Sequence, residues 1–225
     1  MSATASPQAV LATRTLADIA ATLPGATSVF RRRKLDFCCG GRVSLAEASA
    51  AKGLSLADLQ AELDGLAALA DPVALPETTE ALIELIETRY HATHRRELPE
   101  LARLARRTEA AHKAHPVAPH GLADLLETMA AELEDHMQKE EQILFPMMRR
   151  GGHPMIVQPI SVMLAEHGNQ GVHLREIERL TRDFTVPEDA CPTWRALSVG
   201  TRKLTDDLME HIHIENNVLF PRFAG

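Results

Sequence analysis

Aromatic residues are scarce in this chain of 225 residues, of which 4% are Phe, Trp or Tyr. Runs in which β-branched or aromatic residues alternate with polar ones, the pattern of half-buried strands, are nearly absent. Alanine and leucine abound instead, and hydrophobic residues reach 45% of the chain, which is ordinary for a protein with a buried core. These proportions favour packed helices and predict an all-α fold.

Three further absences limit the function classes. The formal net charge is −7, and nucleic-acid binding needs a basic face that releases counterions from phosphates. No stretch approaches the roughly 18 to 20 consecutive apolar residues that a membrane-spanning helix requires. The three cysteines are too few for a disulfide framework, and the N-terminal stretch lacks the features of a signal peptide. We therefore expect a cytoplasmic protein without a nucleic-acid or membrane partner.

Turn-forming residues divide the sequence into two parts of unequal size. The first has the pattern of a small helical domain, in which Ser44 and Ser55 each begin a helix because an acidic residue follows three positions on. The stretch LADPVALPE, residues 69–77, carries two prolines and is the expected domain boundary. The sequence therefore predicts domains at 1–72 and 77–225.

The second part has the pattern of four long helices joined by short connections. Pro99 falls inside the first of them and predicts a kink there. Long helices with short connections are typical of an up-down four-helix bundle. The expected helices cover residues 77–112, 122–149, 155–183 and 192–220.

An internal repeat lies within the predicted bundle. The stretches HMQKEEQILFP, residues 136–146, and HIHIENNVLFP, residues 211–221, share a histidine, a glutamate four residues later and a Leu-Phe-Pro. Another histidine precedes each stretch at nearly the same distance, 45 residues in one case and 44 in the other. This layout predicts two similar helix pairs related by a pseudo-twofold. The repeated residues are His91, His136 and Glu140 in one half and His167, His211 and Glu215 in the other.

The repeated residues have the composition of a metal site. Each predicted helix carries one of the four histidines, and two helices add a glutamate about one turn away on the same face. Burying all six in an apolar core would be very costly without a metal partner. Two carboxylates can bridge two ions while each ion takes two imidazoles, which leaves positions on an octahedral iron for water, dioxygen or nitric oxide. The set predicts two non-haem iron ions per chain.

Other interpretations stand beside this one. A closed zinc site is usually tetrahedral and often contains cysteine, which favours iron over zinc, while manganese stays open. A lone interior histidine is more often a hydrogen-bonded core residue than a ligand, but the matched pairs outweigh that interpretation. Glu132 lies one turn before His136, and Glu166 adjoins His167. Either glutamate could orient a ligand, gate access or relay protons, or could be an exposed helix acid.

A second unusual stretch is RRRKLDFCCGG, residues 31–41, in which Cys38 and Cys39 are adjacent. The two glycines that follow would let the backbone approach a partner closely or take a positive φ. The basic residues before the cysteines are expected to lower the thiol pKa. Vicinal cysteines could form a strained disulfide, bind a soft metal or attack another centre. The alternative is two small apolar residues in a tight turn.

The motifs DFCCGG, RYH ending at His91, HMQKEEQILFPM, ISVMLAEH and HIHIENNVLFPR resemble, in this order, those of the di-iron iron–sulfur cluster repair proteins, the repair of iron centres family. That family combines an N-terminal domain carrying Cys-Cys-Gly-Gly with a C-terminal haemerythrin-like bundle, and the resemblance covers nearly the whole chain. It implies Glu140 and Glu215 as bridges between the irons, together with an oxo or hydroxo group. It implies four terminal ligands, His91, His136, His167 and His211.

The resemblance also implies a function, the repair of iron–sulfur clusters damaged by nitric oxide or oxidants. Iron donation and nitric oxide chemistry at the di-iron site are the two implied routes, and an activity of the nitric oxide reductase type stays open. Cys38 and Cys39 would then serve redox chemistry, iron delivery or docking. The expected partners are damaged iron–sulfur proteins or a cluster-assembly scaffold, with nitric oxide or dioxygen as small ligands, and a homodimer stays open.

Two alternative functions come from other classes. One is a haemerythrin-like binder or sensor of dioxygen or nitric oxide, which would need no thiol pair. The other is a purely structural bundle with satisfied polar groups in its core, which would retain no metal on purification.

Overall fold

The computed structural model describes residues 11–67 and 75–223. Contacts divide the chain into two compact units, one of Glu77–His211 and one of the residues up to Pro76 together with those from Ile212 onward. The expected boundary at 69–77 lies mostly outside the described residues. The domain limits proposed from the sequence therefore stay predictions.

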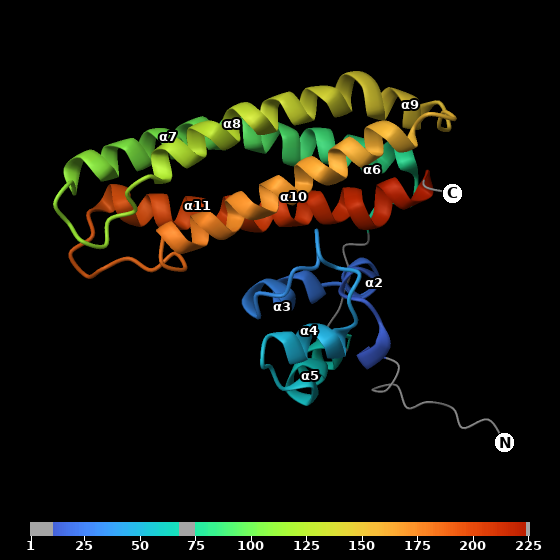
Figure 1. Cartoon of the computed structure of the whole chain (residues 1–225), viewed down its shortest axis with the longest axis horizontal. Helices are drawn as coiled ribbons and strands as arrows, with labels where there is room; N and C mark the ends of the chain where they lie inside the picture. The colour runs from blue at the N-terminus through green and yellow to red at the C-terminus, as the bar shows by residue number, and fades with distance from the viewer. Residues whose placement is uncertain (1–10, 68–74, 224–225) are drawn as a thin grey trace. The chain divides into compact units, whose positions relative to one another are not determined.

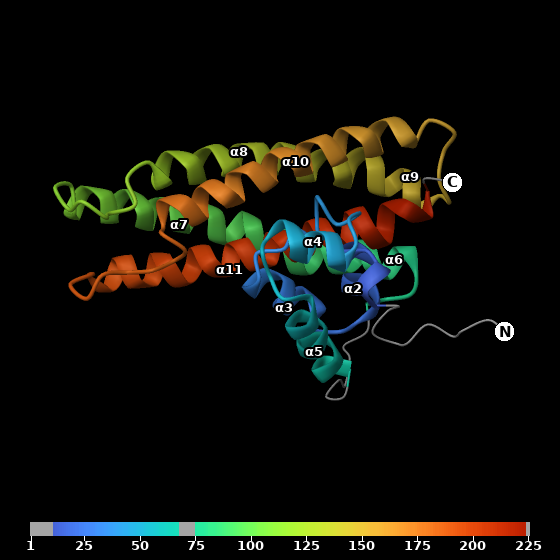
Figure 2. The ribbon, with the colours of Figure 1, turned by 60° about the horizontal axis from the view of Figure 1, so that its bottom comes forward.

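Four long helical segments lie along one another and form the bundle (Figures 1 and 2). Their bounds follow the predicted ones closely, and the described residues contain no strand, only an isolated bridge between Thr15 and Ser44. The all-α bundle prediction is therefore confirmed. The segments are α6 Thr79–Leu85, η1 Ile86–His91 and α7 Ala92–Ala111; α8 Leu122–Lys139, η2 Glu140–Leu144 and α9 Phe145–Arg149; α10 Val157–Leu180; and α11 Pro192–Ile214, η3 Glu215–Leu219 and η4 Phe220–Arg222.

The residues at the helix ends account for where the helices begin. The hydroxyl of Thr78 accepts a hydrogen bond from the backbone N–H of Ala81 and so caps α6. Gly121 takes φ 90° immediately before α8, a conformation that favours glycine. Pro99 lies inside α7, and the helix continues through it to Ala111.

Three segments of the bundle are π-helical rather than α-helical. η1 ends at His91, η2 begins at Glu140 and η3 begins at Glu215. Such segments are rare, occur mostly as single-turn bulges, and are frequent at functional sites. Each one here coincides with a residue of the predicted metal site. The last segment of the bundle continues from α11 into η3 without a break, because Ile214 between them keeps helical φ and ψ.

The helices of the N-terminal part are shorter. Ser44 forms a capping box with Glu47 at the start of α4, and the hydroxyl of Ser55 accepts from the N–H of Asp58 before α5, as the sequence predicts. Phe30 and Phe37 are fully buried and supply much of the core volume. These helices are α2 Leu16–Thr22, α3 Ala26–Arg32, α4 Leu45–Ala51 and α5 Leu56–Ala67.

Gly41 is required by a close approach of two backbone segments. A Cβ built on Gly41 would lie 2.3 Å from the carbonyl oxygen of Phe37 and 3.0 Å from Cβ of Ala17. We expect Gly41→Ala to lower the free energy of unfolding by about 1–3 kcal/mol, because the backbone must shift. A Cβ built on Gly65 in α5 would meet nothing within 4 Å. Gly65→Ala should therefore raise the free energy of unfolding by about 0.4–1 kcal/mol. Urea unfolding followed by circular dichroism would measure both, and equal midpoints would contradict the expectation.

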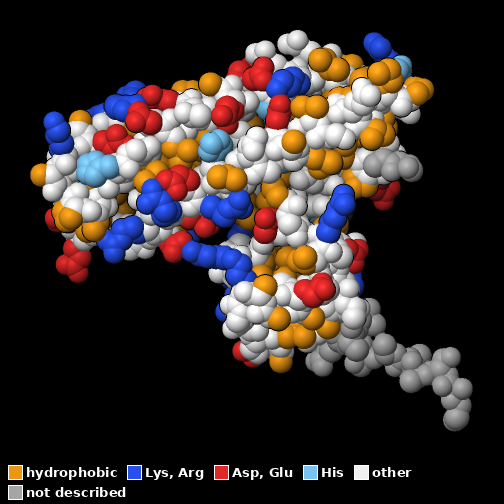
Figure 3. Space-filling view, viewed as in Figure 1, with side chains coloured by type: hydrophobic (Ala, Val, Ile, Leu, Met, Phe, Trp, Pro, Cys, Tyr) orange, Lys and Arg blue, Asp and Glu red, His pale blue; other side chains and the backbone are white. Residues whose placement is uncertain are grey.

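Acidic and basic side chains are interspersed on the face of the molecule drawn in Figure 3. Some are paired between helices of the bundle, such as Arg149 with Glu87 at 2.8 Å. Exposed pairs of this kind contribute about 0–1 kcal/mol each, so they shape the surface more than they stabilise it. Among the described helices, none is long and apolar enough to cross a membrane.

Candidate metal centre

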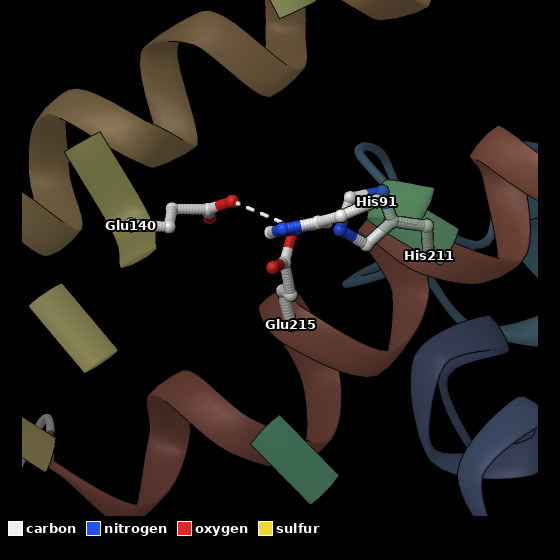
Figure 4. Close-up of side chains that lie close together, drawn as sticks. All are labelled: His91, Glu140, His211 and Glu215. Carbon is white, nitrogen blue, oxygen red and sulfur yellow. Dashed lines mark ion pairs between the residues drawn. The ribbon is translucent and has the colours of Figure 1, made fainter. Parts of the chain in front are cut away.

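Six buried side chains converge in the interior of the bundle, and they are the six that the internal repeat predicts. None is more than 2% exposed. Figure 4 shows four of them, with the two glutamates directed toward the two histidines. The histidines are His91 at the end of η1, His136 in α8, His167 in α10 and His211 in α11, and the glutamates are Glu140 and Glu215 at the first positions of η2 and η3.

The donor atoms fall into two overlapping groups of four, within each of which they lie no more than 4.8 Å apart. Glu140 and Glu215 belong to both groups. Each group therefore offers two imidazoles and shares two carboxylates, which is the composition that a bridged pair of ions requires. Beside the carboxylates, one group contains His91 and His211 and the other contains His136 and His167.

The two oxygens of Glu140 face different histidines. Oε2 lies 3.4 Å from Nε2 of His91, a contact marked in Figure 4, and Oε1 lies 3.4 Å from Nε2 of His136. Nε2 of His136 is in turn 3.0 Å from Nε2 of His167, so these two ring nitrogens approach the same point. Each oxygen of Glu140 is thus placed beside the donors of a different group.

Carboxylates outside the donor set hold two of the imidazoles by their other nitrogens. Nδ1 of His91 lies 2.7 Å from Oε1 of Glu141, and Nδ1 of His136 lies 2.7 Å from Oε2 of Glu166. An ionised carboxylate accepts only, so each Nδ1 carries the proton and donates it. The lone pair is then on Nε2, directed at the centre, which is the tautomer that a metal ligand needs.

Both outer carboxylates are kept ionised. Burial raises the pKa of Glu141, but hydrogen bonds from Arg95 and His91 outweigh it, and the net pKa is lowered. Burial likewise raises the pKa of Glu166, and hydrogen bonds from Lys139 and His136 bring it below its usual value. Each carboxylate therefore remains an acceptor for its imidazole at neutral pH.

Removing one outer carboxylate should weaken metal binding without removing a donor. We expect Glu166→Gln to lower affinity for iron by roughly 10- to 100-fold, because the Nδ1 proton of His136 loses an ionised acceptor. Competition with a chelator of known affinity would measure the change. Glu176→Gln is the matched control on the same helix, because Glu176 pairs with Arg179 on the surface. Equal affinities of the two variants would rule out this role for Glu166.

Glu132 pairs with a histidine outside the donor set. Its side chain is exposed, and Oε2 lies 2.9 Å from Nε2 of His173 in α10. The carboxylate of Glu132 therefore lies at the surface beside His173, whereas Glu166 reaches the ring of His136 from α10.

Two other buried rings pack beside His211. The ring of Tyr90 stacks on it with centroids 5.5 Å apart, and the ring of His94 lies at 5.4 Å. Burial, reinforced by the nearby imidazoles of His211 and His91, lowers the pKa of His94 to about 2. His94 therefore stays neutral and adds no positive charge beside the donor set.

Glu141 is the residue of the site that the sequence patterns missed. It follows Glu140 directly, but the repeat conceals it because Asn216 occupies the equivalent position after Glu215. Arg95 donates to Glu141 at 2.7 Å and to Glu134 at 2.8 Å, which holds the Glu141 carboxylate against His91. The signal in the sequence that could have identified Glu141 is its position as an acidic residue directly next to a repeated ligand, Glu140.

The cysteine pair lies outside this centre, in the loop between α3 and α4. Cys38 is buried, and its Sγ lies 3.7 Å from Sγ of Cys39 and 3.6 Å from Oδ1 of Asp36. A hydrogen bond with Cys39, burial and the charge of Asp36 raise the pKa of Cys38 well above its usual value. The expectation of a lowered thiol pKa is therefore wrong for Cys38. Among the basic residues before the cysteines, Arg33 pairs with Glu62.

The donor set fits iron by its chemistry. Buried imidazole nitrogens and carboxylate oxygens are ligands of iron, and the two outer carboxylates orient the rings as they do around protein-bound metals. A four-helix bundle with four histidines and two shared carboxylates at its centre defines a haemerythrin-like metal-binding protein. Comparison with protein-family models agrees. Residues 82–223 match the hemerythrin HHE cation binding domain, and residues 12–67 match a domain of unknown function named ScdA_N.

Similarity to curated proteins then gives the family. The chain is 44% identical over 210 residues to the iron–sulfur cluster repair proteins YtfE of Citrobacter koseri and of Escherichia coli O157:H7. Each alignment covers 92% of this chain and 94% of the relative. The chain belongs to the YtfE iron–sulfur cluster repair family. This confirms the resemblance first suggested by the Cys-Cys-Gly-Gly and histidine motifs.

Proposed function

We propose that this protein restores iron–sulfur clusters damaged by nitrosative or oxidative stress, using two non-haem irons held by the six buried donors. The observation that carries the proposal is that Glu140 and Glu215 belong to both groups of donors. The name of the relatives, iron–sulfur cluster repair protein, supplies the class of client, a damaged iron–sulfur protein or the scaffold that rebuilds its cluster. We place this work in the cytoplasm.

The residues of the site have separable tasks in this proposal. Four imidazoles would each give a nitrogen donor to an ion, and the two carboxylates would be shared between the ions. Glu141 and Glu166 fix the tautomers of His91 and His136 through their Nδ1 protons. Bound iron would supply redox chemistry, open positions for nitric oxide or dioxygen, and ions that can be given to a client.

A transfer experiment tests the proposal. The protein would be charged with iron-57 and mixed anaerobically with a [4Fe–4S] enzyme whose cluster has been damaged by nitric oxide or peroxide. Repair by donation predicts recovery of enzyme activity with iron-57 in the rebuilt cluster. Repair by nitric oxide chemistry predicts recovery with unlabelled iron only. No recovery beyond that given by free ferrous iron would refute the proposal.

A haemerythrin-like binder or sensor of dioxygen or nitric oxide is the second candidate. It is favoured by the match of residues 82–223 to the hemerythrin HHE cation binding domain, a range that does not include the N-terminal part. The double variant Cys38→Ala, Cys39→Ala separates the two. A carrier or sensor would keep its ligand affinity and its effect in stressed cells, whereas a repair protein that uses the thiols would keep the affinity and lose the effect.

A further inference from the structure

The loop from Asp36 to Gly41 brings together donor atoms that the centre in the bundle does not use. A carboxylate oxygen of Asp36 and the Sγ atoms of Cys38 and Cys39 all lie within 4.8 Å of one another. Two thiolates and a carboxylate are a recognised ligand combination for zinc and for iron. The whole group comes from four consecutive residues of one loop.

Two of the distances between these donors match those between ligands of a single tetrahedral ion. Metal–sulfur bonds of about 2.3 Å and metal–oxygen bonds of about 2.1 Å place two sulfurs about 3.8 Å apart and a sulfur and an oxygen about 3.6 Å apart at tetrahedral angles. The sulfurs of Cys38 and Cys39 are 3.7 Å apart, and Sγ of Cys38 is 3.6 Å from Oδ1 of Asp36. A disulfide would need about 2.05 Å between the sulfurs, so the loop has the spacing of a chelate rather than of a bond.

The carboxylate is oriented by the backbone of the same loop. Oδ1 of Asp36 accepts hydrogen bonds of 3.0 Å from the backbone N–H groups of both Cys39 and Gly40. A Cβ on Gly40 would lie 3.2 Å from Cγ and from Oδ2 of Asp36, so a larger residue at this position would crowd the carboxylate. The close approach at Gly41 fixes the turn that follows. The motif DFCCGG thus has a physical role at each end, a carboxylate at its start and two compact residues at its close.

Side chains near the C-terminus hold the same loop from outside. Nδ2 of Asn216 donates to the carbonyl oxygen of Cys38 at 2.9 Å, and Nδ2 of Asn217 donates to that of Phe37 at 3.1 Å. The ring of Phe37 packs edge-on against His213, with centroids 5.4 Å apart. The loop is therefore fixed at three points, which reduces the ordering that binding of an ion would require.

We propose that Asp36, Cys38 and Cys39 form a second metal site that binds one thiophilic divalent ion, Fe2+ or Zn2+. Three protein donors leave a fourth tetrahedral position, and Cys39 on the exposed side of the loop keeps that position within reach of a thiol from another protein. Both thiols lose their protons to the solvent when the ion binds, and no electron is transferred. The site is independent of the function proposed for the bundle.

Cobalt(II) is the probe for this site, because thiolate coordination gives a charge-transfer band in the near ultraviolet and tetrahedral geometry gives intense visible bands. Full-length protein with its bundle already charged with iron would be titrated anaerobically. We expect one equivalent of Co2+ to produce both bands, with release of protons measured by an indicator in weak buffer. Competition with Zn2+ and with Fe2+ would then show which ion displaces cobalt at the lower concentration.

Matched variants make the result specific. Cys38→Ser or Cys39→Ser should abolish the saturable sulfur band, and Asp36→Asn should weaken binding by roughly 10- to 100-fold while keeping it. Cys191→Ser, which removes the third cysteine, should leave the titration unchanged. The sulfur band should also appear in Glu140→Ala, whose bundle holds no iron, so that failure of the bundle centre does not count against this site. A band that survives Cys38→Ser, or no band in a wild-type chain shown to be folded by circular dichroism, would overturn the proposal.

Discussion

Replacing Glu140 with alanine is expected to reduce iron from about two ions per chain to near zero. Its two oxygens face histidines of different groups, so its loss would remove a donor from both of the proposed ions. Glu215→Ala should have the same effect, because Glu215 is also shared. His136→Ala removes a donor from one group alone. This variant should retain more iron per chain than the glutamate variants, in a mononuclear form. Iron analysis of anaerobically purified protein would give the ratio.

Mössbauer spectra of iron-57 protein distinguish these outcomes further. The wild type should show two antiferromagnetically coupled irons, and the coupling should vanish in both glutamate variants. Glu132→Ala is the matched control, since Glu132 is an exposed acid one turn before His136 and pairs with His173. It should retain the iron and the coupling of the wild type. Mononuclear iron, zinc or no metal in the wild type would contradict the bridged centre itself.

The bundle could be predicted because its signals are local and repeated. The stretch GGHP after the second helix and the sequence TVPED after the third mark ends that the structure places within a few residues. The candidate ligands could be predicted for another reason. A single His-x-x-x-Glu carries little information, whereas two of them, each preceded by a histidine at a matched distance, together indicate one shared metal site.

The sequence could not predict the directions in which individual side chains point from their helices. The π-helical segments at His91, Glu140 and Glu215 change the direction of side chains locally, and a period of 3.6 does not record them. Glu132 and Glu166 were alike as neighbours of a ligand in the sequence. The packing of α10 beside α8 brings Glu166 to the imidazole of His136 and leaves Glu132 at the surface.

The cysteine loop shows a second limit of sequence patterns. A basic run next to a thiol predicts a lowered pKa only if the charges face the sulfur. Here burial and the neighbouring Cys39 decide the pKa of Cys38. The position of Asp36 beside the sulfurs could not be predicted either. An acidic residue two positions before a cysteine lies near its sulfur only in some turn conformations, and the sequence does not specify the turn. The backbone N–H groups of the loop give that carboxylate its place.

Removal of metal is expected to lower the melting temperature of the wild type by roughly 5 to 16 °C. An ion bound only by the folded state stabilises by about 2.7 kcal/mol at 100 times its dissociation constant and by about 4.1 kcal/mol at 1,000 times. Each kcal/mol shifts the midpoint of a chain of this size by roughly 2–4 °C. The physical cause is that Glu140 and Glu215 are 0% exposed, and bound ions would compensate the charge of these buried carboxylates. Calorimetric scans with and without a strong chelator would measure the shift.

The same scans on Glu140→Ala separate metal binding from the fold. This variant should lose the part of the shift that comes from the bundle centre, because its bundle holds no ion to lose. It lacks one of the two buried carboxylates, so it should also melt above the chelated wild type if burial of that charge is what destabilises the metal-free state. Glu132→Ala should show the full shift of the wild type. A chelator-dependent shift that persists in Glu140→Ala would assign the stabilising ion to another site, and the loop of Cys38 and Cys39 would be the first candidate for it.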